Sequence, residues 1–115
     1  MIDVTIYKDK SGYIRGYNVS GHAEYDVYGK DIVCAAVSVL AQTALISLIE
    51  VCHVSEDDIN YIIDEDKGIL DTQISKVLSP DIFDNVEVVL KTFEVGIKSI
   101  IESYPKYVTL RYKEE

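Results

Sequence analysis

The sequence predicts an α+β fold, a mostly antiparallel sheet with two helices in the order ββαββαβ, and three observations support it. Apolar and polar residues alternate in several short segments, as they do in strands that bury one face. Two longer segments carry broad apolar faces at helical spacing. Finally, 115 residues of which 48% are hydrophobic suffice for one core but not for two. Residues 1–115 are therefore expected to form a single domain.

The first two strands are predicted to form a hairpin. Ile2, Val4 and Ile6 alternate with more polar residues, which is typical of a half-buried strand. Residues 10–12, Lys-Ser-Gly, supply turn chemistry, and a second strand is expected over residues 13–20.

The first helix is predicted over residues 32–52, with Asp31 as its N-cap. Its first eighteen residues carry no charge, so the segment reaches the lower length limit for a membrane span. Five polar residues interrupt it: Cys34, Ser38, Gln42, Thr43 and Ser47. We therefore expect a helix buried in a small core, suited also to a dimer interface, and no membrane association.

A second hairpin and a second helix complete the prediction. Residues 60–64 and 69–74 flank an acidic turn in which Gly68 provides backbone freedom. Ser79 and Pro80 are suited to be the N-cap and the first turn of a helix whose apolar stripe continues to Tyr104. A last strand is expected over residues 107–112, and residues 113–115 are expected to form a frayed, solvated tail.

Charge and cysteine content narrow the functional classes. Eleven basic residues against twenty acidic ones give a net charge of −9, which argues against direct nucleic-acid binding and favours a basic protein or peptide as partner. The N-terminus does not have the pattern of a secretory signal, so a cytoplasmic location is expected. Cys34 and Cys52 on one helix would lie about 27 Å apart, too far for a disulfide or a shared metal.

His22 and Cys34 are the candidate catalytic pair. A thiol must ionise to act as a nucleophile, and a helix N-terminus or a cationic neighbour favours the thiolate. Cys34 falls in the first turn of the predicted helix, where unpaired backbone amides could also receive an oxyanion. His22 ends the preceding strand, and the eight residues from 23 to 30 are enough to let the two side chains meet.

Each of these residues also has a purely structural interpretation. Cys34 could be a small buried hydrophobe, and His22 a surface histidine at a strand end. Asp31 is favoured as a helix cap over a group that orients His22, although one carboxylate can do both. Cys52 and His53 are interpreted as a core thiol and a favourable charge at the helix C-terminus.

The segment around the pair is a candidate substrate-binding region. Gly21 and Gly29 bracket a loop that contains Tyr25 and Tyr28, and this loop could act as a lid over the thiol. Ser38 lies one turn beyond Cys34 and could line the same site. No histidine and carboxylate cluster suggests a metal, and no glycine-rich turn suggests a phosphate, so no cofactor is expected.

These residues carry a resemblance to a known family. GHA, five further residues and then G-x-DIVCAAVS resemble the signature of the bacterial ribosomal-processing cysteine proteases, the Prp family. The length, the element order and the position of the motif agree over essentially the whole chain, whereas outside the motif the resemblance is only architectural.

The resemblance implies a specific activity. The protein would remove the N-terminal extension of large-subunit ribosomal protein twenty-seven, after a phenylalanine-containing segment, so that the ribosome can assemble. His22 and Cys34 would take the catalytic roles, and Asp31 matches a motif position as a less secure third member. The resemblance also implies a homodimer in which the loop between the catalytic residues orders around the substrate.

Two other classes compete with this interpretation. A non-catalytic module could bind a basic ribosomal protein through its acidic face, with the motif merely shaping a pocket. A thiol redox regulator is less well supported, because the sequence has no C-x-x-C pair and no nearby resolving cysteine.

Overall fold

The computed structural model describes residues 1–27 and 30–115, and its elements follow the predicted order. They are β1 (Ile2–Lys8), β2 (Ile14–Gly21), α1 (Ile32–Glu50), a short 3-10 helix η1 (Glu56–Asp58), β3 (Ile59–Asp64), β4 (Ile69–Ile74), α2 (Pro80–Ser103) and β5 (Val108–Glu114). The order ββαββαβ is confirmed, and η1 is an addition that no sequence pattern indicated.

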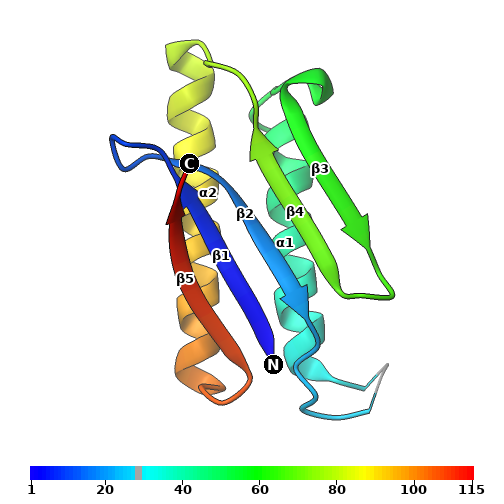
Figure 1. Ribbon diagram of the computed structural model, residues 1–115. Helices are drawn as coiled ribbons and strands as arrows, with labels where there is room; N and C mark the ends of the chain where they lie inside the picture. Colours follow the sequence, from blue (N-terminus) through cyan, green and yellow to red (C-terminus); the bar gives the residue numbers. More distant parts are fainter. Residues whose placement is uncertain (28–29) are drawn as a thin grey trace.

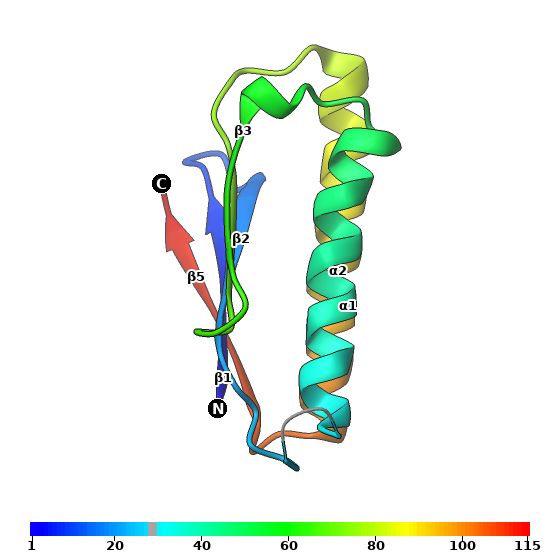
Figure 2. The same ribbon diagram turned by 90° about the vertical axis from the view of Figure 1, so that its right-hand side faces the viewer.

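The strands form one five-stranded sheet in the order β3-β4-β2-β1-β5 (Figure 1). Three of the four pairings are antiparallel, and only β1 and β5 run parallel. The exception follows from α2, which carries the chain back along the sheet so that β5 starts at the same end as β4 and β1. Both helices lie on one face of the sheet (Figure 2), so the predicted two-layer α+β architecture is confirmed.

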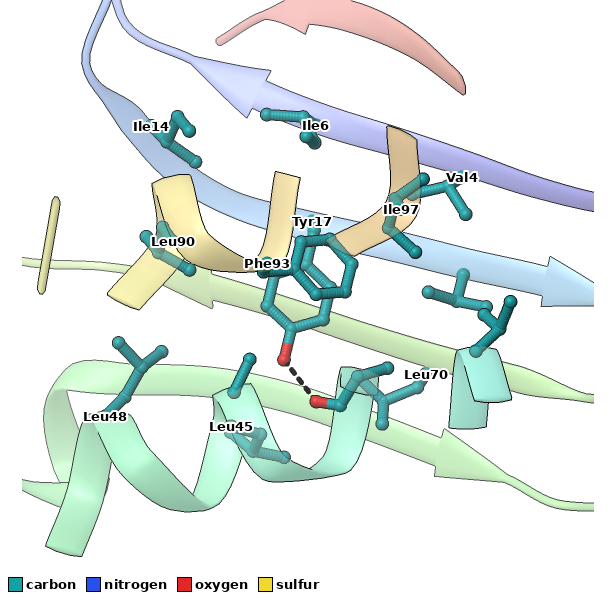
Figure 3. Close-up of a cluster of buried hydrophobic side chains, with 14 of the residues drawn as sticks. Val4, Ile6, Ile14, Tyr17, Leu45, Leu48, Leu70, Leu90, Phe93 and Ile97 are labelled. Carbon is teal, nitrogen blue, oxygen red and sulfur yellow. Dashed lines mark hydrogen bonds between the residues drawn. The ribbon is translucent and has the colours of Figure 1, made fainter. Parts of the chain in front are cut away.

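The core lies between the sheet and the helices, and Tyr17 connects its parts. The Tyr17 ring stacks on Phe93 of α2 with 4.2 Å between ring centroids. Its hydroxyl donates a 2.6 Å hydrogen bond to the carbonyl oxygen of Ala41 in α1 (Figure 3). A buried side chain of β2 therefore holds both helices and sets where α1 lies on the sheet.

The helix α1 begins after Asp31, as predicted, and ends at Glu50, two residues earlier than predicted. It is long and apolar enough to span a membrane by length and composition alone. It lies along the sheet (Figure 2) and buries one apolar face against it, made of Val33, Val37, Ala41, Ala44, Leu45 and Leu48, while further apolar residues of the helix remain exposed. This placement is that of a core helix.

The helix α2 buries the centre of the predicted stripe, with Val86, Leu90, Phe93 and Ile97 buried. It ends at Ser103, shortly before Pro105, as expected. Ser79 occupies the N-cap position and Pro80 the first turn, as predicted, although the Ser79 side chain makes no capping hydrogen bond. Pro80 at the start of the helix lacks an N–H, which leaves one fewer donor for a cap to satisfy.

The C-terminal residues correct another prediction. Lys113 and Glu114 belong to β5 and pair with Tyr7 and Lys8 of β1. The backbone amide of Glu115 donates a 2.8 Å hydrogen bond to the Lys8 carbonyl oxygen. The expected frayed tail is therefore a strand end, because backbone pairing with the neighbouring strand β1 does not require apolar side chains.

Candidate active site

The ends of two elements bring His22 and Cys34 to one place. His22 directly follows β2, and Cys34 is the third residue of α1. Both side chains line the same two surface hollows, of about 330 Å³ and 560 Å³. The sequence prediction that the 23–30 connection lets these residues approach each other therefore agrees with their placement.

The Cys34 sulfur is half-buried and receives a directed hydrogen-bond donor. The backbone N–H of Ala23, the residue after His22, points at Sγ with a nitrogen to sulfur distance of 3.2 Å. A donor to sulfur stabilises a thiolate more than a neutral thiol, because hydrogen bonds to an ionised acceptor are stronger. Residues 22 and 23 thus supply both the imidazole and a backbone amide that favours the thiolate form of Cys34.

Asp31 is the buried N-cap of α1 and the centre of a backbone network. Its Oδ1 accepts the amides of Val33 and Cys34 at 3.0 and 2.9 Å. Its Oδ2 accepts the amides of Tyr25 and Asp26 at 2.9 and 3.3 Å. The capping role is confirmed, and one carboxylate joins the start of the helix to the preceding loop.

These hydrogen bonds also determine the ionisation of Asp31. Burial by itself raises the pKa of this carboxyl, but the amides of Cys34, Asp26 and Tyr25, together with the Cys34 side chain, outweigh burial and lower the pKa. Asp31 is therefore an ionised acceptor across the physiological range.

Three amides of the first turn are already paired, and for these the sequence-based expectation of unpaired donors is wrong. The amides of Val33 and Cys34 are bound by the Asp31 side chain, and the Ala35 amide donates to the Asp31 carbonyl oxygen at 3.0 Å. An N-cap satisfies the donors that a helix start would otherwise offer to an oxyanion. Another donor, or an exchange of partners, is needed for that role.

The turn between β3 and β4 is a part of the site that the sequence did not reveal. The carbonyl oxygen of Asp66 lies 3.4 Å from Nε2 of His22. The neighbouring Gly68 has φ +63°, and a Cβ there would lie 2.5 Å from the Gly21 carbonyl oxygen. The only sequence signal for this contact was Gly68, and a glycine occurs in tight hairpin turns whether or not they contact a functional site.

The two hollows share His22, Cys34 and Ser38 and differ in their other lining residues. The one toward β3 and β4 combines apolar side chains, among them Val37, Ile63 and Leu70, with the carboxylates of Asp64 and Glu65. The other extends over the loop before α1 and includes Glu24, Asp26 and Asp31. A peptide that crosses Cys34 would therefore meet carboxylates in both hollows.

Ser38 lines both hollows one turn after Cys34. Its Oγ accepts a 2.7 Å hydrogen bond from Nε2 of Gln42, so the hydroxyl proton remains to be donated elsewhere. Ser38 is thus placed where the sequence expected it, beside the nucleophile.

The loop residues are placed less simply. Gly21 lines the apolar hollow, and its φ of +94° brings it so close to β1 that a Cβ would lie 2.5 Å from the Met1 carbonyl oxygen. The Tyr25 ring packs edge-on against Tyr104 and Tyr107, at 5.5 and 5.1 Å between centroids, and not over the thiol. Tyr28 and Gly29 lie outside the described residues.

Cys52 and His53 lie at the other end of α1. Cys52 is buried, and burial raises the pKa of its thiol, whereas His53 is exposed. Within residues 1–27 and 30–115, no group of three or more His, Cys, Asp or Glu side chains is arranged to hold a metal ion. The chemistry that the described site offers is that of Cys34 and His22.

A helix start that presents a half-buried thiol beside an imidazole is the arrangement that cysteine peptidases use. The comparison with protein families agrees with it. The family model described as cysteine protease Prp matches residues 1–109, and the chain belongs to this family.

Similar proteins occur in Staphylococcus aureus and Streptococcus mutans. The ribosomal processing cysteine protease Prp of Staphylococcus aureus strain Mu50 is 31% identical over 98% of this chain and 100% of its own length. A crystal structure of S. aureus Prp with a covalently linked product peptide aligns with a TM-score of 0.81 and 26% identity, over 98% of this chain and 100% of that one. A crystal structure of SMU.848 from Streptococcus mutans aligns with a TM-score of 0.80 and 27% identity, over 100% of this chain and 96% of that one.

Proposed function

We propose that this protein is a cysteine endopeptidase that removes the N-terminal extension of large-subunit ribosomal protein twenty-seven and thereby enables ribosome assembly. The S. aureus relative is named as a ribosomal processing protease. A further S. aureus Prp structure, with a substrate peptide, aligns at a TM-score of 0.78 and 25% identity over 98% of this chain and 100% of that one. The observation that carries the proposal is the position of Cys34 and His22, which line both hollows.

The charge around the hollows supports a basic substrate. Five carboxylates line them: Glu24, Asp26, Asp31, Asp64 and Glu65. The whole chain carries a net charge of −9, and ribosomal proteins are basic because they bind RNA. Such complementarity raises the rate of encounter and favours basic partners over acidic ones.

In the first half of the reaction, His22 takes the proton of Cys34, and the thiolate attacks the scissile carbonyl carbon to form a carbon to sulfur bond. The Ala23 amide, 3.2 Å from Sγ, stabilises the thiolate before attack. His22 then gives its proton to the leaving amine as the peptide bond breaks. The product of this half is a thioester on Cys34.

The developing oxyanion needs a donor, and we assign this role to the Ser38 hydroxyl. The amides of Val33 and Cys34 are bound to Asp31, whereas Ser38 accepts from Gln42 and keeps its own proton to donate. In the second half, His22 removes a proton from water, which hydrolyses the thioester and restores the thiol. The sequence of steps uses no metal or organic cofactor.

The protein is also proposed to be a cytoplasmic homodimer. Ile32, Val39 and Ile46 recur every seven residues on α1 and are 54%, 65% and 51% exposed. An exposed apolar row of this kind is more typical of an interface than of a surface in water. Sedimentation of the protein across a range of concentrations, with Val39→Glu as the interface variant, measures the association.

Peptide cleavage tests the proposal. A peptide that spans the extension is incubated with the wild type, Cys34→Ala and His22→Ala, and the products are identified by mass spectrometry. A single cut by the wild type that disappears in both variants supports the proposal. Binding of the peptide without a cut by any of the proteins would point to a non-catalytic module that docks a basic ribosomal protein.

A further inference from the structure

The catalytic histidine lies against a turn that is distant in the sequence. His22 Nε2 is 3.4 Å from the carbonyl oxygen of Asp66, which is 44 residues away in the turn between β3 and β4. Gly68 of the same turn lies beside the imidazole, so that a Cβ on it would come within 3.0 Å of His22 Cε1. The turn therefore places one polar atom, the Asp66 carbonyl oxygen, at the ring, and it leaves no room there for a side chain at position 68.

We propose that this turn, residues 65–68, is a positioning element for the catalytic base. In this assignment the Asp66 carbonyl selects which nitrogen of His22 carries the proton, and Gly68 sets how closely the turn approaches the ring. The inference rests on the proposed role of His22, and the experiment below separates the two.

The Asp66 carbonyl oxygen determines which tautomer of His22 the site favours. A carbonyl oxygen can only accept, so a hydrogen bond between Asp66 and His22 requires the proton on Nε2. In the neutral imidazole Nδ1 then holds the lone pair and is the nitrogen that takes the proton from Cys34. After the transfer, both nitrogens carry protons and the Asp66 carbonyl stabilises the cation. One proton moves from sulfur to nitrogen, and no further reactant is needed.

In many catalytic triads a carboxylate or amide side chain orients the histidine. It accepts a hydrogen bond from the ring nitrogen that does not face the nucleophile. Asp31 is the acidic residue nearest in the motif, but its two oxygens accept the four amides of Tyr25, Asp26, Val33 and Cys34. A backbone carbonyl of the turn takes the orienting position instead.

The turn is held well enough to act in this way. The Gly68 amide donates to the Glu65 carbonyl oxygen at 3.2 Å. The Lys67 amide donates to Oδ1 of Asp64 at 3.1 Å. The two flanking strands pair along their full length, from Ile59 with Ile74 to Asp64 with Ile69. The position of the carbonyl is therefore set by the sheet.

A matched pair of glycine variants tests the proposal. Gly68→Ala and Gly12→Ala both place a side chain at positive φ, +63° and +88°, so both variants carry a backbone penalty of the same kind. Gly12 has no atom within 4 Å of a Cβ, whereas Gly68 faces the Gly21 carbonyl oxygen and His22. A difference between the variants thus reports the contacts of the turn with Gly21 and His22 and not the local backbone strain.

Three readouts are compared. The expected result for Gly68→Ala is a fall in kcat on the order of 10²-fold with KM nearly unchanged, because a displaced catalytic group affects the chemical step. The pH profile of Cys34 alkylation should move toward that of His22→Ala. Gly12→Ala should retain the wild-type kcat, KM and pH profile. Equal behaviour of the two glycine variants would overturn the inference.

An NMR measurement covers the case in which Gly68→Ala does not fold. The Cys34→Ala protein contains only two histidines, and His53→Gln identifies their signals. At a pH where both imidazoles are neutral, ¹⁵N shifts should show the proton of His22 on Nε2. A proton on Nδ1 would contradict the inference. Full cleavage by His22→Ala would instead contradict the proposed catalytic role of His22.

Discussion

The backbone amide of Cys34 donates a 2.9 Å hydrogen bond to Oδ1 of Asp31, so the residue that caps α1 also binds the backbone of the proposed nucleophile. The other oxygen of the carboxylate holds Tyr25 and Asp26 of the preceding loop. The loop and the helix start are consequently joined through one buried charge. Loss of this charge should affect folding and the geometry of the site together.

Asp31→Ala should therefore lower the free energy of unfolding by about 1–2 kcal/mol at neutral pH, the range for loss of an N-cap. The pKa of Asp31 is lowered in the folded state, so its contribution is present above the unfolded pKa and is lost as the pH falls through the folded one. The difference from the wild type should shrink below about pH 4. Urea denaturation at several pH values measures it.

Ser79→Ala is a suitable control for this prediction. Ser79 also occupies an N-cap position, but its side chain makes no capping hydrogen bond. Its replacement should change the free energy of unfolding by less than about 0.5 kcal/mol. A loss as large as that of Asp31→Ala would show that the Asp31 network is not the cause.

Ser38→Ala should reduce kcat on the order of 10²-fold and leave KM nearly unchanged, as expected when an oxyanion donor is removed. Steady-state kinetics with the extension peptide separate the two constants. Gln42→Ala removes the group that donates to Ser38 and should have a smaller effect, because the Ser38 proton is retained. A rise in KM alone for Ser38→Ala would make Ser38 a binding residue and not a donor to the transition state.

Glu87→Gln should stabilise the protein at neutral pH by about 1 kcal/mol. Glu87 is 6% exposed, and within the described residues its Oε2 has no hydrogen-bond partner, while Oε1 accepts the Ile14 amide at 2.9 Å. Burial raises the pKa of Glu87. The Ile14 amide and the nearby charges of Lys91 and Arg15 oppose this shift but do not cancel it.

The raised pKa gives this variant a pH signature. A carboxyl with a higher folded pKa contributes stability below the unfolded pKa and loses it as the pH rises through the folded pKa. The advantage of Glu87→Gln should thus grow from acid to neutral pH, as thermal unfolding can show. Glu87→Ala should destabilise the protein at all pH values, because it leaves the Ile14 amide unsatisfied.

The sequence predicted those features that local periodicity and capping determine. The strand alternation at Ile2, Val4 and Ile6, the Asp31 cap and the apolar stripe of α2 all appear in the structure. Periodicity gives no information on strand order, so the parallel pairing of β5 with β1, which includes Lys113 and Glu114, could not be predicted.

The site was predictable only in part for a similar reason. His22, Asp31 and Cys34 belong to one continuous motif, so their proximity follows from a single strand, loop and helix. The Asp66 carbonyl is a backbone atom in a distant hairpin, and any residue type could supply it. The pairing of the first-turn amides with Asp31 was missed because a cap and an oxyanion site require the same donors.

The most direct test of the central claim is the intact mass of the protein in a reaction quenched with acid during turnover of the extension peptide. The proposed mechanism predicts a species heavier than the free protein by the acyl part of the peptide, released by hydroxylamine and localised to Cys34. Its absence in Cys34→Ala, together with loss of cleavage, would complete the result. Cleavage that proceeds with no acyl group on Cys34, or with the group on Cys52, would contradict the proposed mechanism.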